Sequence, residues 1–265
     1  MAQQPAGRLK VGVIGAGGRM GQALLAQIAA APDLELAGAV ERPGHPSCGQ
    51  PVAGGLIVCA NVAPVAHRAR VLVDFSTPEA LPETVRAAEE ADCALVVGTT
   101  GLGPEHEALL DRAARTVPVL ASANMSVGVH LLARLVEEAA RRLGPEFDVE
   151  LMDLHHRAKR DAPSGTALLL AEAAARGRGR SLAELRLPPP QGVSGPRPPG
   201  GIGLAALRGG SAAGEHRVWF LGPGERVELA HVAEDRAIFA RGALVAARWL
   251  AGRPPGRYAM AEVLG

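Results

Sequence analysis

The segment that most restricts how this chain can fold lies between residues 9 and 31. Residues 9–14 are an apolar run of strand length, residues 15–21 contain four glycines, and residues 23–31 have an apolar helical pattern. A strand, a glycine-rich turn and a helix in this order are the context that a dinucleotide-binding fingerprint requires. Glycine lets the backbone approach a pyrophosphate closely, and the helix N-terminus attracts its negative charge.

The spacing of these glycines is a variant, because Met20 stands where the usual third glycine would fall. A glycine run alone also fits a structural tight turn. The next predicted strand, residues 34–40, favours the nucleotide interpretation because an acid, Glu41, follows it. A carboxylate there suits the free 2′-hydroxyl of NADH, whereas the adjoining Arg42 suits the 2′-phosphate of NADPH. The pair predicts that both cofactors are accepted, although an ordinary surface loop explains Arg42 equally well.

Apolar strands alternate with helical patterns through the first half of the chain. The predicted strands are 11–14, 34–40, 56–59, 71–75, 94–97 and 117–121, and the predicted helices are 21–31, 78–91 and 104–116. Such alternation is typical of a doubly wound parallel sheet. Polar loops at 74–78, 98–101 and 122–125 follow three of these strands. Because ligands of open α/β sheets bind beyond the carboxyl ends of the strands, we expect these loops to line the cofactor, although each alone is also ordinary turn chemistry.

The pattern changes at Ser126, a predicted N-cap of a long amphipathic helix that Gly144 ends. The elements predicted after it are strands at 147–154, 204–207, 216–221 and 226–231, and helices at 166–175 and 236–250. The later strands favour an antiparallel or mixed sheet, and the last helix is expected to pack on the first domain. Residues 176–203 are rich in Pro, Gly and Arg and predict a long exposed loop. A length of 265 residues suits two domains, which we place at 1–126 completed by 236–265, and at 127–235.

The loop after the strand at 147–154 concentrates reactive side chains. Two imidazoles, His155 and His156, precede Lys159, and Ser164 opens the next helical pattern. A helix N-terminus holds a carboxylate or phosphate with its unpaired N–H groups, and histidine exchanges protons near neutral pH. Lys10 and Lys159 are the two lysines among 28 basic residues, which indicates a need for an ammonium group that can release a proton. The pattern predicts a site that binds an anion and protonates it; the alternative is a solvated basic loop.

Composition argues against several other classes of protein. A net charge of +1 and 3% aromatic residues give no support for nucleic-acid binding. No apolar stretch has the length of a membrane span and residues 1–8 lack a signal segment, so we expect a cytoplasmic protein without a membrane partner. Three distant cysteines form neither a disulfide framework nor a zinc knuckle. Adjacent His155 and His156 rarely bind one ion, so we expect no metal site.

Five motifs together resemble the dihydrodipicolinate reductase family. They are GAGGRMG at residues 15–21, DFSTP at 74–78, GTTG at 98–101, NMSVG at 124–128 and HHRAKRDAPSGTA at 155–167. The last motif is highly specific, whereas the glycine turn alone is not, and the resemblance extends from about residue 9 to residue 264. It implies an α/β fold, with an N-terminal Rossmann-type doubly wound parallel sheet and a smaller α+β domain with a mixed open sheet for substrate binding and oligomerisation.

The activity that the resemblance implies is the NAD(P)H-dependent reduction of 4-hydroxy-tetrahydrodipicolinate to tetrahydrodipicolinate, in the diaminopimelate route of lysine biosynthesis. His155 would act as the acid/base group and Lys159 as the proton donor. The resemblance assigns the carboxylates of this small cyclic substrate to His156, Lys159, Ser164, Gly165 and Thr166. It assigns NADH or NADPH to Gly15, Ala16, Gly17, Gly18, Arg19, Met20, Glu41, Arg42, Gly98, Thr99, Thr100, Ser122, Ala123, Asn124 and Met125. It also implies a homotetramer built through the sheet of the second domain.

The chain departs from the family pattern at Ser211, where an acid is usual, in the residues after His231, and in the proline-rich residues 188–200. These positions concern subunit contacts and loop motion more than the chemistry. Two other functions stay open. One is another Rossmann-type amino-acid or semialdehyde dehydrogenase that shares only the cofactor half, and the other is a nucleotide-binding sensor or scaffold without turnover.

Overall fold

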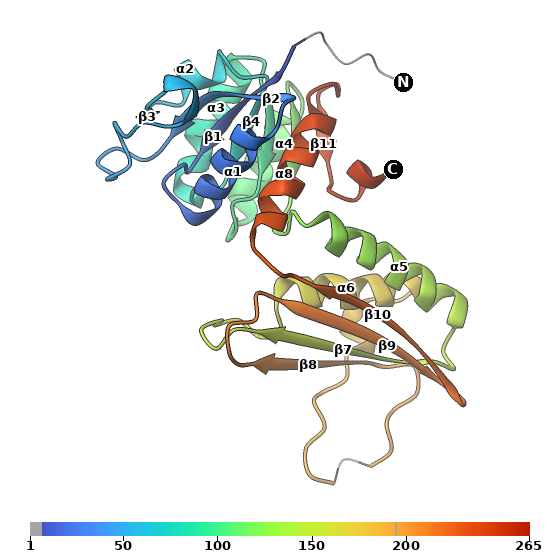
Figure 1. Cartoon of the computed structure of the whole chain (residues 1–265). Helices are drawn as coiled ribbons and strands as arrows, with labels where there is room; N and C mark the ends of the chain where they lie inside the picture. The colour runs from blue at the N-terminus through green and yellow to red at the C-terminus, as the bar shows by residue number, and fades with distance from the viewer. Residues whose placement is uncertain (1–6, 194) are drawn as a thin grey trace. The chain divides into compact units, whose positions relative to one another are not determined.

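The structure, a computed structural model, describes residues 7–193 and 195–265 and divides the chain into two compact units (Figure 1). Unit 1 comprises the described residues up to Ser126 together with Ala237–Gly265, and unit 2 comprises Val127–Arg236. Residues 1–6, which bear on the expected lack of a signal segment, lie outside the described residues. Within the described part of the chain, no helix combines the length and the apolar character that crossing a membrane requires.

Unit 1 is built on a seven-stranded sheet in which every pairing is parallel. The strands, in their spatial order, are β11 (Gly256–Tyr258), β6 (Pro118–Ala121), β5 (Ala94–Val97), β4 (Val71–Asp74), β1 (Leu9–Ile14), β2 (Leu34–Val40) and β3 (Val58–Cys59). Strands β4 and β5 are buried at every residue, as expected of central strands covered by helices on both faces. The predicted doubly wound sheet is confirmed.

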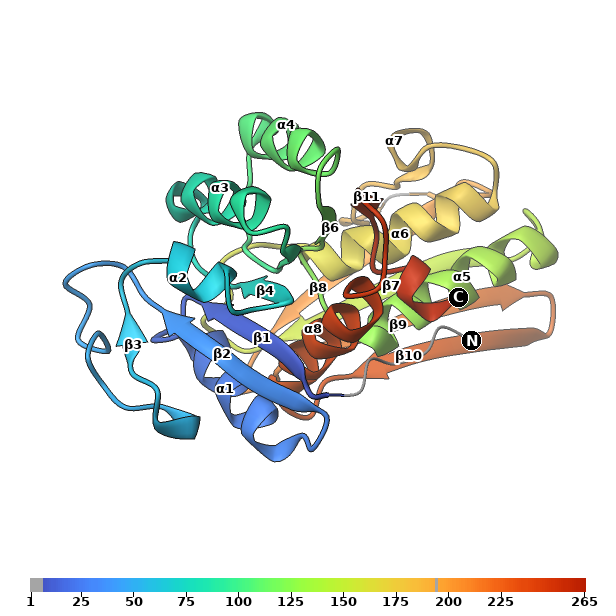
Figure 2. The ribbon, with the colours of Figure 1, turned by 90° about the horizontal axis from the view of Figure 1, so that it is seen from above.

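Helices cover both faces of this sheet, as Figure 2 shows. The helices are α1 (Arg19–Ala30), α2 (Ala63–Ala66), α3 (Leu81–Glu90), α4 (Pro104–Ala113) and α8 (Ala237–Leu250). Helices α1 and α8 pack together on one face, while α3 packs against α2 and α4 on the other. The expected packing of the last helix on the first domain is therefore confirmed. The helix predicted at 78–91 is interrupted, because Pro78–Ala80 is a 3-10 turn and α3 starts at Leu81.

Unit 2 is a four-stranded mixed sheet with two helices on one face (Figure 1). The strand order is β10 (Glu225–Val232), β9 (Glu215–Gly222), β7 (Asp148–His155) and β8 (Ile202–Arg208). Strands β7 and β8 are parallel and the other neighbours antiparallel, as the sequence predicts. Helices α5 (Val127–Leu143) and α6 (Gly165–Gly177) pack on each other and enclose a core with the facing side chains of β7 and β9, such as Leu151 and Phe220.

The prediction of a long loop at residues 176–203 is wrong in part. Its first residues complete α6, a short helix α7 (Leu182–Leu185) follows, and Ile202 begins β8. The start of α7 has a capping box, in which the Glu184 carboxylate accepts the N–H and the hydroxyl of Ser181. Within residues 186–201, Arg197 donates to Asp148 and Glu150 at the start of β7, at 2.7 and 2.9 Å. Because residues 176–203 are rich in Pro, Gly and Arg, we expected a loop there and missed the capping box at Ser181.

Candidate active site

The glycine turn of unit 1 follows β1 and has the close backbone approach that its sequence suggests. Gly15 has a φ of +80°, and the N–H groups of Gly15 and Ala16 both donate to the carbonyl of Val40 in β2. A Cβ on Gly21 would lie 2.1 Å from the Gly15 carbonyl oxygen, so α1 rests directly on the turn. Gly21 thus supplies the close helix packing that the usual third glycine supplies, which explains why Met20 is tolerated.

The first turn of α1 is open to a ligand. Helix α1 begins at Arg19, its N-cap Gly18 offers no side chain, and the first turn contains no acid. A Cβ on Gly18 would meet one atom within 4 Å, at 3.4 Å. The uncapped N–H groups and the helix dipole therefore suit a phosphate. Ala16 is fully buried and its N–H donates to the carbonyl of Val40, so it supports the turn and does not itself face a ligand.

Glu41 lies beside this turn. One carboxylate oxygen accepts the N–H of Gly17 and the other accepts the N–H of Arg42, both at 2.9 Å. The loop after β2 also leans on Gly17, because a Cβ there would lie 2.5 Å from Cε1 of His45 and 2.7 Å from the hydroxyl of Ser47. None of the sequence motifs assigns a role to His45. The structure instead makes it a neighbour of the predicted phosphate turn.

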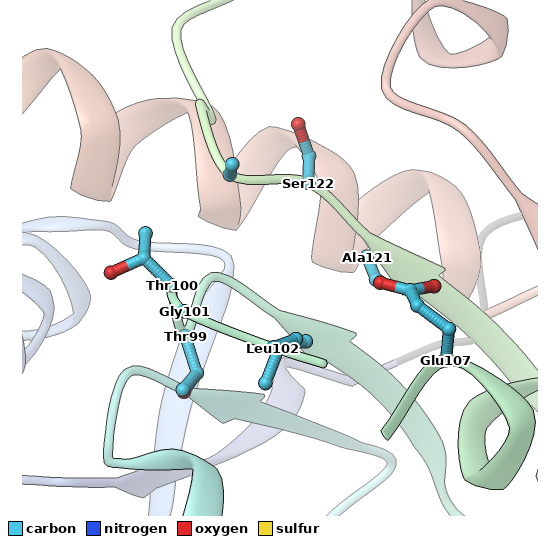
Figure 3. Close-up of a pocket in the computed structure, with 8 residues that line it drawn as sticks. Thr99, Thr100, Gly101, Leu102, Glu107, Ala121 and Ser122 are labelled. Carbon is cyan, nitrogen blue, oxygen red and sulfur yellow. The ribbon is translucent and has the colours of Figure 1, made fainter. Parts of the chain in front are cut away.

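The loops that follow β5 and β6 line a pocket of about 190 Å³. In Figure 3 the segment from Thr99 to Leu102 lies on one side and Ala121 with Ser122 on the other. The remaining lining residues are Ala123 and Glu107. The structure therefore brings Thr99, Thr100, Ser122 and Ala123 together at the carboxyl edge of the sheet, where the sequence predicts the cofactor loops.

Asp74, at the end of β4, organises these loops. It is fully buried, and its Oδ1 accepts the hydroxyls of Ser76 and Thr99 at 2.6 and 2.9 Å. Burial raises the pKa of this carboxyl, and the hydrogen bonds from Ser76 and Thr99 oppose that shift. Because the Thr99 hydroxyl is committed to Asp74, its backbone is the part left for a ligand. Next along the edge, a Cβ on Gly98 would lie 2.3 Å from the ring of Phe75.

The turn after β6 is held by its own side chains. The Ser122 hydroxyl donates to the carbonyl of Asn124 at 2.6 Å, and the Asn124 side chain accepts the N–H of Ser126 at 2.8 Å. Met125 is 1% exposed and packs in the core. Of the predicted cofactor residues in this turn, Met125 is thus the one whose side chain a ligand cannot easily reach.

In unit 2, the reactive loop connects β7 to α6. His155 is the last residue of β7, and Ser164 is the N-cap of α6, where its hydroxyl accepts the N–H of Ala167 at 3.1 Å. Gly165 is exposed and Thr166 half-buried. The predicted helix N-terminus is therefore present, with its first N–H groups near solvent, which is the arrangement that binds a carboxylate.

Lys159 lies in this loop, with one fifth of its side chain exposed, and its ammonium donates to Asp161 at 2.8 Å. That hydrogen bond lowers the pKa of the Asp161 carboxyl. His156 contacts a different set of residues from His155. Its backbone N–H donates to the carbonyl of Ala212, and its Nε2 is 3.3 Å from the guanidinium of Arg236. The two adjacent imidazoles thus have separate surroundings, consistent with separate roles.

Sequence reasoning missed the buried charges beneath this loop. Asp153, two residues before His155 in β7, has its Oδ1 2.5 Å from His155 Nδ1, although the ring N–H does not point straight at that oxygen. Its Oδ2 accepts the N–H of Ser164 at 2.6 Å and lies 3.2 Å from the guanidinium of Arg208. His216, from β9, places Nε2 3.1 Å from the Ser164 hydroxyl. Successive side chains of a strand point to opposite faces, so Asp153 and His155 lie on the same face of β7. The sequence alone could have predicted this placement.

These contacts shift the pKa values of the cluster. Burial lowers the pKa of His155, against the opposing charge of Asp153. Burial also lowers the pKa of His216, to about 4. Burial alone would raise the pKa of Asp153, but the N–H of Ser164 and the positive charges of His155 and Arg208 outweigh it and hold that pKa below its usual range. Near neutral pH the two imidazoles are therefore mainly neutral and the carboxylate is ionised.

The same three side chains meet the geometric requirement for a metal site. Among residues 7–193 and 195–265, ligand atoms of Asp153, His155 and His216 lie within 4.8 Å of one another. The expectation of no metal considered His156 and cysteine partners, and it overlooked this group. The guanidinium of Arg208 on Asp153 disfavours a divalent cation here, because it already neutralises the carboxylate. The absence of a metal cofactor stays a prediction.

The fold and the two sites define a class of protein, a two-domain enzyme fold that combines a Rossmann-like nucleotide-binding domain with a mixed-sheet domain. The sequence matches the family "Dihydrodipicolinate reductase, N-terminus" over residues 9–125 and "Dihydrodipicolinate reductase, C-terminus" over residues 128–264. The chain therefore belongs to the dihydrodipicolinate reductase family, whose members are oxidoreductases.

Curated relatives agree with this assignment. The chain is 51% identical over 268 residues to a 4-hydroxy-tetrahydrodipicolinate reductase of Methylocella silvestris, covering 98% of each chain. It is 49% identical over 261 residues to the enzyme of the same name from Brucella abortus, covering 96% of this chain and 97% of the relative. The resemblance inferred from the five motifs is confirmed.

Solved structures show the same fold. A dipicolinate-bound dihydrodipicolinate reductase from Paenisporosarcina sp. TG-14 superimposes with a TM-score of 0.77 at 22% identity, covering 95% of this chain and 97% of the other. A DAP dehydrogenase from C. glutamicum in complex with DAP gives a TM-score of 0.57 at 16% identity, covering 97% and 96%. At these identities the likeness concerns the fold alone.

Proposed function

We propose that this chain reduces 4-hydroxy-tetrahydrodipicolinate to tetrahydrodipicolinate with a reduced nicotinamide cofactor, as a step of the diaminopimelate route of lysine biosynthesis. The relatives at 51% and 49% identity have this activity in their names and match nearly the whole chain. The observation that carries the proposal is the site in unit 2, where His155, Lys159 and the N-terminus of α6 lie on one loop.

Unit 1 would hold NADH or NADPH. The glycine turn and the open first turn of α1 suit the pyrophosphate. Glu41 accepts the N–H of Gly17 in that turn and Arg42 follows it, so these two residues would be the ones nearest the adenosine ribose. The residues from Gly98 to Thr100 and from Ser122 to Met125 lie along the carboxyl edge of the same sheet. The nicotinamide, when bound, supplies a hydride; the protein's task there is to orient it and to exclude water.

The substrate is a small dicarboxylate, and unit 2 offers groups for both of its negative charges. The N–H groups at Gly165 and Thr166 are at the start of α6, where the helix dipole favours a carboxylate. Lys159 and His156, whose neighbour is Arg236, add positive charge or hydrogen-bond donors on the same loop. Fixing the ring through two carboxylates supplies the orientation on which catalysis depends.

Lys159 and His155 provide the proton chemistry. Loss of the 4-hydroxyl group of the substrate as water gives a conjugated imine, and hydride addition to that imine leaves negative charge on the ring that must be neutralised by a proton. His155 is mainly neutral near pH 7 because burial lowers its pKa. Lys159 is therefore the group that brings a proton to the substrate, and a carboxylate of the substrate competes with Asp161 for its ammonium. His155 acts as the acid/base group that exchanges the proton.

The unit 2 sheet supports self-association as a homotetramer. Helices α5 and α6 cover one face, so the alternate side chains of the strands form the other face. On that face Leu207 is 48% exposed, Leu221 38% and Val232 53%, and Met152 and Trp219 lie near them in register. Exposed apolar side chains on a sheet face favour a subunit interface, and this face also carries the Arg217–Glu228 ion pair. Light scattering should show tetramers that Leu207→Glu dissociates, while Leu131→Glu, at an exposed leucine of α5, leaves them intact.

A coupled assay tests the proposed activity. A synthase makes the cyclic substrate from pyruvate and aspartate semialdehyde, and the absorbance of NADH or NADPH is followed with the purified protein. Oxidation that depends on the running synthase supports the proposal, and the two rates give the cofactor preference that Glu41 and Arg42 set together. Nicotinamide binding without synthase-dependent oxidation would favour a sensor or a dehydrogenase for a linear substrate. We also propose that the enzyme acts in the cytoplasm, where this biosynthetic route supplies lysine.

A further inference from the structure

One buried carboxylate lies beneath the substrate loop and has no part in the reaction described so far. Asp153 is 1% exposed. Its Oδ1 is 2.5 Å from His155 Nδ1 and 3.8 Å from His216 Nε2. Its Oδ2 accepts the N–H of Ser164 at 2.6 Å and is 3.2 Å from Arg208. Isolated carboxylates are rarely buried, because removing the charge from water costs free energy that only good partners offset.

We propose that Asp153 is a positioning residue for the reductase reaction: it holds His155 in the tautomer protonated on Nδ1, and through the N–H of Ser164 it anchors the first turn of α6. The inference rests on the proposed function, because it explains how the acid/base histidine and the carboxylate-binding turn of that function are kept in a fixed relation. A single side chain then connects the group that handles the proton with the group that holds the substrate.

The contact with His155 determines which ring nitrogen carries the proton. A carboxylate oxygen next to Nδ1 stabilises a proton on that nitrogen, so the lone pair of the neutral ring is left on Nε2. Nε2 lies beside Gly214, where a Cβ would be 3.1 Å away. Glycine at this position, with a φ of +156°, therefore leaves Nε2 uncovered. Nε2 is the nitrogen available for proton exchange.

The contact with Ser164 connects Asp153 to the substrate-binding turn. The Ser164 N–H is the first donor at the start of α6, and Asp153 satisfies it. The Ser164 hydroxyl accepts the N–H of Ala167 and lies 3.1 Å from His216 Nε2. With its own N–H and hydroxyl occupied inside the protein, Ser164 fixes the turn, and the next N–H groups along the chain, at Gly165 and Thr166, are the ones that would bind a substrate carboxylate.

The charged and titratable groups that face His155 come from four segments. Asp153 comes from β7, Arg208 from the end of β8, His216 from β9, and Lys159 from the loop. Of these, Asp153 favours the protonated imidazole, whereas Lys159 and Arg208 oppose it. Removing the carboxylate while keeping its shape must therefore lower the pKa of His155 further.

The test uses Asp153→Asn and the pH dependence of turnover. We expect kcat to fall by about 10-fold or more, because the tautomer of His155 is no longer fixed. We expect the limb of the pH profile that belongs to His155 to move to lower pH by about 1 unit, while the Kd for NADH stays within about 2-fold. Asp153→Glu, which keeps the charge, should recover part of kcat and of the pH profile. A pH profile of Asp153→Asn that coincides with the wild type overturns the proposal.

A matched control uses the other end of the same strand. Asp148 also lies in β7 and bonds Arg197 in the 186–201 loop, far along the strand from the reactive loop. Asp148→Asn should leave the pH profile of kcat unchanged. If Asp148→Asn moves the limb as much as Asp153→Asn does, the shift reflects general damage to the sheet and the proposal fails.

A spectroscopic test needs no variant at Asp153 and no turnover. In protein with ¹⁵N-labelled histidine, the two ring nitrogens of His155, identified from the spectrum of His155→Gln, should show the Nδ1-protonated tautomer at pH 7.5. The Nε2-protonated tautomer contradicts the proposal. Because this measurement requires only folded protein, its result is separate from the coupled assay: no turnover with the predicted tautomer would overturn the proposed function and leave the arrangement of Asp153 standing.

Discussion

The two candidate sites would contact their ligands through different kinds of chemical group. In unit 1 the ligand would meet backbone N–H groups, glycines and short hydroxyl side chains at the ends of neighbouring parallel strands. In unit 2 it would meet side chains that rest on buried charges from three strands. A backbone site binds by shape and dipole and tolerates many side-chain changes. A charged site depends on each member, because one missing partner leaves another charge unsatisfied.

This difference explains what each unit contributes. A dinucleotide is large and is held by many modest contacts, so no single residue of unit 1 dominates. The chemistry of proton transfer instead requires titratable groups with defined protonation states, and burial sets those states in unit 2.

Lys159→Ala should lower kcat by about 100- to 10,000-fold, because the variant loses the group that we propose as the proton donor. Binding of NADH, which belongs to unit 1, should stay unchanged in a fluorescence titration. The matched control is Lys10→Ala, which removes the other lysine of the chain, an exposed one in β1, and should keep near-normal turnover. A Lys159→Ala enzyme with more than about half of the wild-type kcat would contradict the assignment.

Acid should weaken the fold through the imidazoles of unit 2. The folded-state pKa of His216 is about 4, below the ordinary 6.5, because the residue is buried. Between these values the unfolded chain binds more protons than the folded one, so stability is complete above about pH 6.5 and falls as the pH drops toward 4. His216 alone accounts for up to about 3 kcal/mol over that range. Denaturant titrations of His216→Asn should show a shallower pH dependence; an identical slope would count against the shift.

Gly15→Ala should damage unit 1 by a smaller amount. A side chain at a φ of +80° is strained, and the new Cβ would lie 2.5 Å from the carbonyl oxygen of Phe75. We expect a loss of roughly 1–3 kcal/mol in stability and a Kd for NADH at least several-fold weaker. Gly144→Ala is the control: it adds a side chain at a φ of +67° with open space around it, and so introduces backbone strain without the close contact at the glycine turn. Equal effects of both variants on NADH binding would show that the glycine turn has no special role.

The sequence predicts the strands and helices of unit 1 more fully than the buried charged groups of unit 2, for physical reasons. Strands and helices of unit 1 follow from local periodicity, and the N-cap at Ser164 is a local signal as well. Asp153, Arg208 and His216 meet only because β7, β8 and β9 are neighbours, and pairing between segments more than 50 residues apart has no local signature. The orientation of Thr99 toward Asp74, and the position of His45 on Gly17, depend on tertiary packing in the same way.

Short helices and strands were also missed in the prediction from sequence. Strand β11 has three residues and α7 has four, too few for a periodic pattern to stand out. The capping box at Ser181 was nonetheless present in the sequence and should outweigh local Pro and Gly content in such cases.

The most direct test of the central claim is a crystal structure of this protein with NADH and dipicolinate, the aromatic analogue of the product ring. We expect one carboxylate on the N–H groups of Gly165 and Thr166 with Lys159 beside it, and Asp161 released from the ammonium. We also expect His155 Nε2, and not Nδ1, on the side of the ligand. A dicarboxylate bound elsewhere, with Lys159 still paired to Asp161, would contradict that claim.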